Sequence, residues 1–216
     1  MKLDMLIEAA EKEWFEHWQE GPTRLRRTTL PLQVGDSAPD LTLPDQTGNT
    51  VQISDFWTER PALLLFWRHF GCGCGVGRAE RLVTEYNTLM EAGARCVIIG
   101  QGEPERATWY AEKFDIPCPI LCDPEERAYL AYGLLEMDPW LLLGEPKPGP
   151  EHFHKVMQKH REMGRPVADN PFLLPGEFVV SRAGTLMLAY RYQYCDNYPD
   201  LATLTSSVKQ AIMEAP

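Results

Sequence analysis

Apolar strands alternate with amphipathic helices through the middle of the chain, and this order limits the folds that the chain can adopt. The sequence predicts strands at 62–70, 95–100 and 118–122, with helices at 78–93, 103–115 and 123–134 between and after them. A strand, a helix and a second strand in succession favour a parallel sheet whose faces are covered by helices. The chain is therefore predicted to be an α/β protein.

Further elements flank this central part. The sequence predicts, in order, a helix at 3–19, two short strands within 34–56, a hairpin at 177–194 and a closing helix at 200–214. The hairpin would add antiparallel strands to the sheet. We expect an N-terminal helix and basic loop over 1–32, and one domain over 33–216. A region rich in proline and histidine, at about 136–172, would be an insertion in that domain.

The acidic composition of the chain excludes some classes of partner. Its 216 residues carry a formal net charge of −10, which argues against binding to nucleic acid or to an anionic membrane surface. No apolar run reaches the roughly 18 residues of a membrane span, and the first residues are too acidic for a signal peptide. These observations predict a cytoplasmic protein, whose thiols are normally reduced. Its six cysteines then indicate redox, metal-binding or core roles rather than a disulfide framework.

Two of these cysteines, Cys72 and Cys74, lie in a glycine-rich stretch after the first core strand. We expect 71–77 to form a turn, with glycines that permit unusual backbone angles. The following helix would offer free N–H groups and partial positive charge, which favour a thiolate over a thiol. Arg68 and Arg78 would add positive charge nearby. Two thiols in such a turn predict a redox or metal site, and Cys74, nearer the helix, is expected to be the more reactive thiol.

Several motifs of the chain together carry a family pattern. They are VGDSAPDLTLPDQTGNTVQISDF, PALLLFWRHF, IPCPILCDPEERAYLAYGL and LPGEFVVSRAGTLMLAY, spread over 34–215. This order resembles the peroxiredoxin-like branch of the thioredoxin-fold superfamily, the alkyl hydroperoxide reductase and thiol-specific antioxidant family. FWRHFGC is similar to Phe-Phe-Arg-His-x-Gly-Cys-x-x-Cys of one subfamily, with the spacer shortened to Cys-x-Cys. The resemblance implies a thioredoxin-like fold with a central mixed sheet flanked by helices, here with an N-terminal helical extension.

The chain departs from the family pattern at the site itself. Ordinary peroxiredoxins have Pro-x-x-x-Thr-x-x-Cys in this loop, whereas here Arg68 takes the place of the proline and no Thr precedes either cysteine. Peroxiredoxins also carry an arginine before the penultimate strand, where this chain has Pro175. The similarity to thioredoxin-like reductases at this point implies that Pro175 is a cis-proline. We therefore expect weak turnover of hydrogen peroxide.

The implied topology also suggests where the other cysteines lie. In a thioredoxin-like sheet the final hairpin returns to the edge at which the parallel strands end, so Cys195 is expected near the two loop cysteines. Cys122 ends a parallel strand at the same edge, on the flank of the sheet. Cys96 and Cys118 begin strands and are expected to be small core residues toward the opposite edge.

Two functions remain open on these residues, and an inactive interaction scaffold is a third alternative. In the first, the chain is a thiol-dependent oxidoreductase in which one loop cysteine attacks a peroxide or a disulfide. Arg68 would assist, and Cys195 or the other loop cysteine would resolve the intermediate. This function needs no cofactor, and its partner would be a thioredoxin- or glutathione-like reductant. In the second function, zinc or an iron–sulfur cluster is bound by Cys72, Cys74, Cys122 and Cys195. A homodimer is an open alternative to a monomer.

The histidines are assigned structural roles. His69, in the core strand before the loop, is expected to be half-buried with its hydrogen bonds satisfied. His152, His154 and His160 lie in a charged helical stretch and are expected on its solvated face. His-x-His can bind a metal ion, but the charged surroundings favour a solvated helix.

Overall fold

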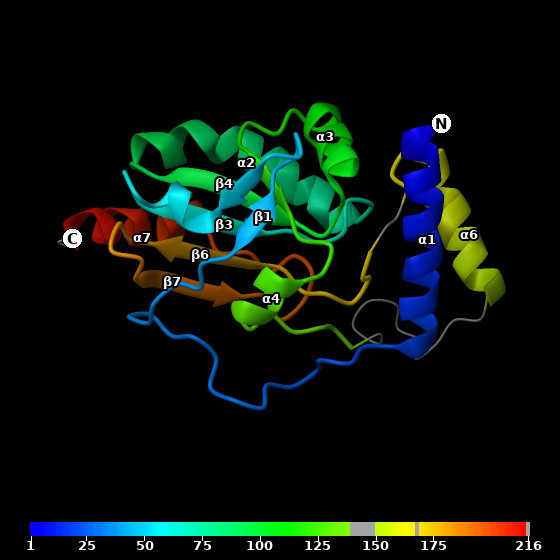
Figure 1. Cartoon of the computed structure of the whole chain (residues 1–216), viewed down its shortest axis with the longest axis horizontal. Helices are drawn as coiled ribbons and strands as arrows, with labels where there is room; N and C mark the ends of the chain where they lie inside the picture. Colours follow the sequence, from blue (N-terminus) through cyan, green and yellow to red (C-terminus); the bar gives the residue numbers. More distant parts are fainter. Residues whose placement is uncertain (139–149, 167–168, 215–216) are drawn as a thin grey trace.

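The computed structural model describes residues 1–138, 150–166 and 169–214 and shows a mixed sheet between layers of other elements (Figure 1). The sheet contains β3 (Ala62–Phe66), β4 (Arg95–Gly100), β5 (Ile120–Cys122), β6 (Gly176–Val180) and β7 (Leu186–Arg191), in the order β5-β4-β3-β6-β7. β3, β4 and β5 are parallel, whereas β6 is antiparallel to both of its neighbours, β3 and β7. This confirms the predicted α/β class with a central mixed sheet.

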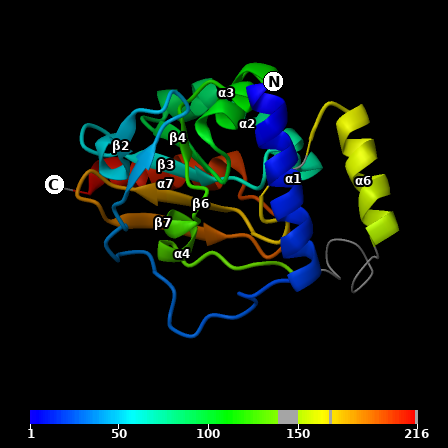
Figure 2. The same ribbon diagram turned by 45° about the vertical axis from the view of Figure 1, so that its right-hand side comes forward.

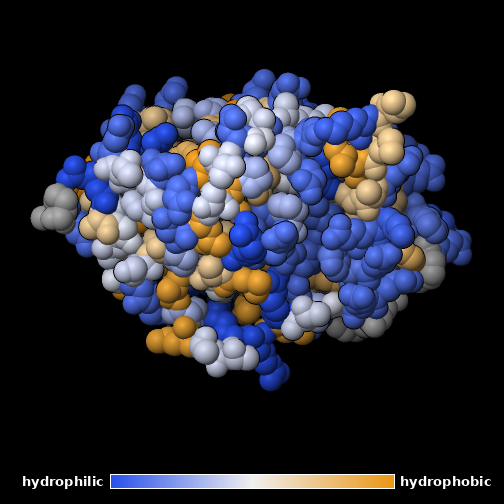
Figure 3. All heavy atoms as spheres, viewed as in Figure 1, coloured by the Kyte–Doolittle hydropathy of each residue, from blue (hydrophilic) through white to orange (hydrophobic). Residues whose placement is uncertain are grey.

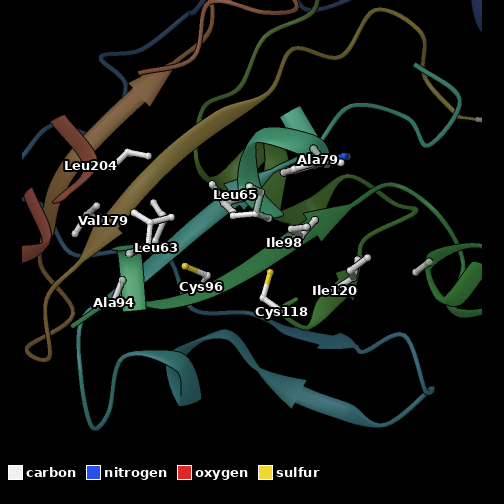
Figure 4. Packing of buried hydrophobic residues seen from close by; sticks show 14 of the residues in the cluster. Leu63, Leu65, Ala79, Ala94, Cys96, Ile98, Cys118, Ile120, Val179 and Leu204 are labelled. Atoms are coloured by element: carbon white, nitrogen blue, oxygen red, sulfur yellow. The ribbon is translucent and has the colours of Figure 1, made fainter. Parts of the chain in front are cut away.

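Each face of the sheet is covered by different elements. One face packs against α2 (Gly73–Glu91), α3 (Pro104–Lys113) and α7 (Leu201–Met213), and Figure 4 shows the inward side chains of the strands on this side. The other face packs against the hairpin β1 (Thr42–Pro44) and β2 (Thr50–Gln52), the 3-10 turn η1 (Ile53–Phe56) and α4 (Arg127–Ala131). Because both faces are covered, every residue of β3 is buried.

β3 is shorter than the sequence predicts. It pairs with its neighbours as far as Phe66, which lies opposite Ile99 on β4 and Gly176 on β6. The Trp67 N–H still donates to the Ile99 carbonyl at 2.8 Å, and the chain then leaves the sheet. Residues 67–70 remain buried outside the strand, and this is why their apolar content predicted a strand that continues to residue 70.

Two helices pack against one another and against the edge at which β3 ends (Figures 1 and 2). They are α1 (Lys2–Glu20) and α6 (Pro150–Glu162), and Arg161 of α6 forms an ion pair with Glu11 of α1. A small apolar cluster joins them to the body of the chain: Trp14, Trp18, Met157 and Phe172. The N-terminal helical extension is thus confirmed.

These two helices, α1 and α6, come from different parts of the chain, and their polar sides face outward. α1 belongs to the predicted extension, whereas α6 lies within the predicted insertion at 136–172, of which 139–149, 167 and 168 lie outside the described residues. The face in Figure 3 is mainly hydrophilic over α1, because the apolar side of this helix packs inward. No helix in the described part of the chain is long and apolar enough to cross a membrane.

Candidate active site

The helix that carries the cysteine pair begins earlier than predicted. α2 starts at Gly73 with Cys72 at its N-cap, so Cys74 lies in its first turn. None of the glycines from Gly71 to Gly77 has a positive φ, and the expectation of unusual backbone angles was therefore wrong. Glycine instead weakens the first turn, because each one in a helix costs about 1 kcal/mol relative to alanine.

Cys72 and Cys74 form a disulfide across this helix start, with their Cα atoms 5.5 Å apart. Cys72 is only 7% exposed, whereas Cys74 is partly exposed. An incoming thiolate therefore reaches the Cys74 sulfur more readily. The N-cap position also places Cys72 beside the free N–H groups of the first turn. The helix N-terminus thus favours a Cys72 thiolate at least as much, and exposure, rather than the helix dipole, supports greater reactivity of Cys74.

A small cavity of about 20 Å³ lies beside the disulfide and is large enough for one water molecule. Cys74 lines it from α2, and Cys195 lines it from the turn that follows β7. The structure therefore brings Cys195 to the loop cysteines, where the topology of the sheet places it. Its role in the chemistry stays a prediction at this point.

Arg68 is a buried cation in the wall of this cavity, 2% exposed. Its guanidinium donates hydrogen bonds to the carbonyls of Pro171 at 2.6 Å and Leu173 at 3.3 Å, and its Nε has no hydrogen-bond partner. Within the described residues no carboxylate forms an ion pair with it. Burial lowers the pKa of Arg68 to about 10, while the proximity of Cys195 acts in the opposite direction. A buried cation without a counter-ion is able to stabilise an anion that forms in the cavity.

Arg78, by contrast, is neutralised by a buried carboxylate that the sequence analysis missed. Its Nε donates to Glu177 at 2.8 Å, and the hydroxyl of Tyr192 donates to the same carboxylate at 2.5 Å. Burial alone would lower the pKa of Arg78, but Glu177 raises it overall. All three side chains line the cavity. The sequence did contain a signal for it, the single acid in the otherwise apolar strand GEFVV. All five residues of this strand are buried, and a buried carboxylate needs a partner.

His69 is buried under α1 rather than half-buried as predicted. It is 5% exposed, and its ring lies 5.7 Å from that of Trp14, measured between centroids. Its Nδ1 has no hydrogen-bond partner. Burial, with Arg68, His160 and Arg106 as further causes, holds the pKa of His69 well below its ordinary value of 6.5. His69 therefore stays neutral in the folded protein at neutral pH.

α6 also reaches the cysteine loop. His160 is half-buried and its imidazole interacts with the backbone of Gly71, so the prediction of a solvated position was wrong for this residue. His154 is exposed, as predicted. The side chain of His152 lies outside the described residues. The segment that leads to the cysteine pair is thus contacted by α1 at His69 and by α6 at Gly71.

We expect acid to destabilise the protein through His69. The pKa of His69 is lower in the folded than in the unfolded protein. The imidazole therefore costs no stability above pH 6.5, whereas the free energy of unfolding falls as the pH drops from 6.5 toward the folded pKa, because only the unfolded chain takes up the proton. The slope is up to about 1.4 kcal/mol per pH unit. His160, whose pKa is also lowered by burial, acts in the same direction. Urea unfolding between about pH 7 and pH 5 should show a smaller loss of stability in His69→Gln than in the wild type, and equal losses would contradict this assignment.

The remaining cysteines lie in the core. Cys96 and Cys118 are buried side by side in the cluster of Figure 4, as predicted. Cys122 is fully buried, which raises its pKa to about 12, and it does not line the cavity with Cys74. In the part of the chain that the structure describes, no group of three or more His, Cys, Asp or Glu side chains is placed to hold a metal ion. The set of four cysteine ligands that includes Cys122 is therefore not assembled.

Pro175 lines the cavity, but the Leu174–Pro175 peptide is trans, so the prediction of a cis-proline was wrong. The segment is held on both sides by backbone hydrogen bonds. The Leu174 N–H donates to the Leu135 carbonyl at 2.9 Å, and the Tyr192 N–H donates to the Pro175 carbonyl at 3.1 Å. These bonds lead the trans backbone directly into β6.

The fold and the site define a class of protein. A mixed sheet in this strand order, with a cysteine pair at the N-terminus of the helix after β3, is that of thioredoxin-fold thiol proteins. The model of the AhpC/TSA family matches residues 34–189, and the chain belongs to this family. This confirms the resemblance to the peroxiredoxin-like branch.

Curated relatives match about half of the chain. The chain is 31% identical over 104 residues to Peroxiredoxin Bcp of Escherichia coli, covering 48% of this chain and 66% of that protein. It is 32% identical over 98 residues to the chloroplastic thioredoxin-like protein AAED1 of Arabidopsis thaliana, covering 45% and 40%. It is 28% identical to the thiol-disulfide oxidoreductase ResA of Geobacillus thermodenitrificans, covering 48% and 59%. The matches thus span 40% to 66% of these relatives.

Solved structures support the fold. The peroxidoxin BcpB of Mycobacterium tuberculosis aligns with a TM-score of 0.55 at 16% identity, covering 84% of this chain and 95% of that one. PrxQ of Xylella fastidiosa aligns with a TM-score of 0.60 at 9% identity, covering 85% and 99%. At these identities the likeness concerns the thioredoxin-like fold alone.

Proposed function

We propose that the protein is a thiol-dependent oxidoreductase whose Cys72–Cys74 pair cycles between disulfide and dithiol. The observation that carries this proposal is the disulfide at the start of α2, with one sulfur partly exposed and beside a cavity lined by Arg68, a cation without a carboxylate partner in the described residues. Substrates would be peroxides or disulfides. The reductant would be a thioredoxin- or glutathione-like thiol, in keeping with the family.

Reduction would begin at Cys74. The thiolate of the reductant attacks the Cys74 sulfur, because Cys72 is nearly covered. The bond between the two loop sulfurs breaks, and Cys72 leaves as a thiolate that the N–H groups of the first turn of α2 stabilise. A second thiol of the reductant then releases Cys74. Two electrons and two protons have passed to the protein, and the reductant is left as a disulfide.

Disulfides fit this site better than hydrogen peroxide does. The Thr of the ordinary peroxiredoxin motif is absent, and Pro175 replaces the arginine of that motif. Arg68 is the one cation of the cavity without a carboxylate partner in the described residues, and its guanidinium already donates to Pro171 and Leu173. The site therefore lacks two side chains of the ordinary peroxiredoxin motif that could orient a peroxide oxygen.

We expect kcat/KM for a disulfide such as oxidised glutathione to exceed that for hydrogen peroxide by about tenfold or more. A factor of ten corresponds to about 1.4 kcal/mol of transition-state stabilisation, about that of one oriented hydrogen bond. Stopped-flow oxidation of the reduced protein by each substrate, followed by mass analysis of the loop peptide, measures both rates. Faster oxidation by hydrogen peroxide would reverse the preference, and a loop pair that no thiol reduces would refute the proposed function.

The cellular setting of this activity belongs to the same proposal. A cytoplasmic location would supply the thiol reductant. The acidic charge of the chain disfavours nucleic acid and anionic membranes as partners. Gel filtration with light scattering would decide between a monomer and a homodimer.

A further inference from the structure

We propose that Cys195 is the third cysteine of the redox cycle: its thiolate displaces Cys72 from Cys74 and carries the disulfide to the turn after β7. The inference rests on the proposed cycling of the loop pair and adds a route out of the site. It is carried by the position of Cys195, by the charge of Arg68 and by the composition of the first turn of α2.

The two loop cysteines differ in whether they share a cavity with Cys195. Cys74 and Cys195 line its wall, whereas Cys72 does not. Cys72 instead lies next to Gly71, whose backbone is covered by His160 of α6. Because Cys195 and Cys74 face the same cavity, attack by Cys195 on the disulfide would fall on the Cys74 sulfur, with Cys72 as the leaving group.

Arg68 supplies positive charge to this cavity. Burial lowers the pKa of Arg68, and the proximity of Cys195 and Tyr129 acts in the opposite direction. Tyr129 is fully buried and its hydroxyl donates to the carbonyls of Trp67 and Ile99, so it stays neutral. Arg68 and Cys195 line the same cavity, which places a buried guanidinium on the wall that this cysteine shares with Cys74. Arg78 is unavailable for this purpose because Glu177 pairs with it.

The turn that contains Cys195 is open to a partner. Cys195 is partly exposed, and its neighbour Tyr194 is 49% exposed. The backbone N–H groups of Gln193 and Tyr194 both donate to the side chain of Asn197, which fixes the shape of the turn. A disulfide that reaches Cys195 would therefore present a second partly exposed sulfur to an external thiol.

The helix start that carries Cys74 is able to shift toward Cys195. Gly73, Gly75 and Gly77 occupy its first turns, and each weakens the helix by about 1 kcal/mol relative to alanine. An added Cβ at Gly77 would meet nothing within 4 Å, so close packing does not account for this glycine. Weakened first turns allow Cys74 to change partner without unfolding the rest of α2.

The step conserves atoms and electrons. Cys195 loses its proton, its thiolate forms a bond to the Cys74 sulfur, and the bond between Cys74 and Cys72 breaks. Cys72 leaves as a thiolate and takes up a proton. No external oxidant is consumed, since one disulfide replaces another. A thiol reductant, the class already named, then attacks the Cys195 sulfur and releases Cys74, and a second thiol of that reductant releases Cys195 and leaves the reductant as a disulfide.

The test uses the full chain with Cys72→Ser, oxidised with diamide, which joins two thiols into a disulfide. Trypsin cleavage after arginine and lysine places Cys74 in peptide 69–78 and Cys195 in peptide 192–209. We expect a linked pair of these peptides, which reduction separates. The matched control is Cys74→Ser, which keeps Cys72 and Cys195. Because Cys72 is covered, its linkage to Cys195 should form at least about tenfold more slowly.

Two results would overturn the inference. One is the absence of a link between Cys74 and Cys195 in a Cys72→Ser protein whose circular dichroism spectrum matches the wild type. The other is equal linking in the two variants. Either result leaves the proposed function intact if the wild-type loop pair still cycles with thiols, so the failures of the two proposals are distinguishable.

Discussion

Replacing Cys74 by serine is expected to abolish thiol-dependent reduction of a disulfide substrate, with a loss of about a thousandfold or more in kcat/KM, as for other enzymes that lose their nucleophile. Cys74 is the loop sulfur that is partly exposed and that lines the cavity. Serine preserves its size but forms neither a thiolate nor a disulfide. The rate of oxidised glutathione reduction by wild type and variant, with dithiothreitol as the final reductant, measures the effect.

Cys122→Ala is the matched control for this loss. Cys122 is fully buried on β5, and its thiol is held protonated by burial, which raises its pKa to about 12. Alanine at this position should cost about 1 kcal/mol of stability and leave the rate unchanged. Comparable losses in both variants would show that Cys122 takes part in the chemistry, contrary to its location.

Glu177→Gln is expected to lower the free energy of unfolding by about 3–5 kcal/mol, because it leaves the Arg78 guanidinium buried without its counter-charge. The two side chains are only 7% and 2% exposed. In a chain of this length such a change lowers the melting temperature by about 10 °C. Urea unfolding at neutral pH, followed by tryptophan fluorescence, gives the difference in free energy directly.

The triple variant Arg78→Met, Glu177→Leu and Tyr192→Phe tests whether the expected loss of stability comes from the unpaired charge or from altered packing. It removes the buried charges and also the hydroxyl that donates to Glu177. Apolar replacement of a buried ion pair is often neutral or stabilising. The triple variant should therefore be more stable than Glu177→Gln. If it is less stable, packing rather than the unpaired charge accounts for the effect.

The order of elements was predictable from the sequence because it depends on near neighbours along the chain. Apolar periodicity located α1, β4, α3 and the final hairpin, and Gly184 lies in the turn of that hairpin with a φ of 80°. The cysteine pair was recognisable because glycine and cysteine at this density follow a buried strand. The return of Cys195 to that pair followed from the implied topology of the sheet.

Predictions failed where helical and extended backbone have similar local signals. Glycine in 71–77 suggested a turn, yet α2 begins at Gly73, although each glycine in a helix costs about 1 kcal/mol relative to alanine. Residues 67–70 suggested strand, yet their burial comes from packing outside the sheet. The trans peptide before Pro175 depends on its hydrogen-bonded neighbours, Leu135 and Tyr192.

By itself, then, the sequence determined the α/β order, the redox-type cysteine pair and the family, since these depend on local periodicity and contiguous motifs. Only the tertiary structure decided which charges remain free at the site. Arg78 and Glu177 are 99 residues apart in the chain, and their pairing leaves Arg68 as the cation of the cavity without a carboxylate partner in the described residues. It also decided that His69 is neutral, because α1 covers it with Trp14. Burial and charge pairing depend on residues that are close in space but distant in the chain, so no local pattern in the sequence predicts them.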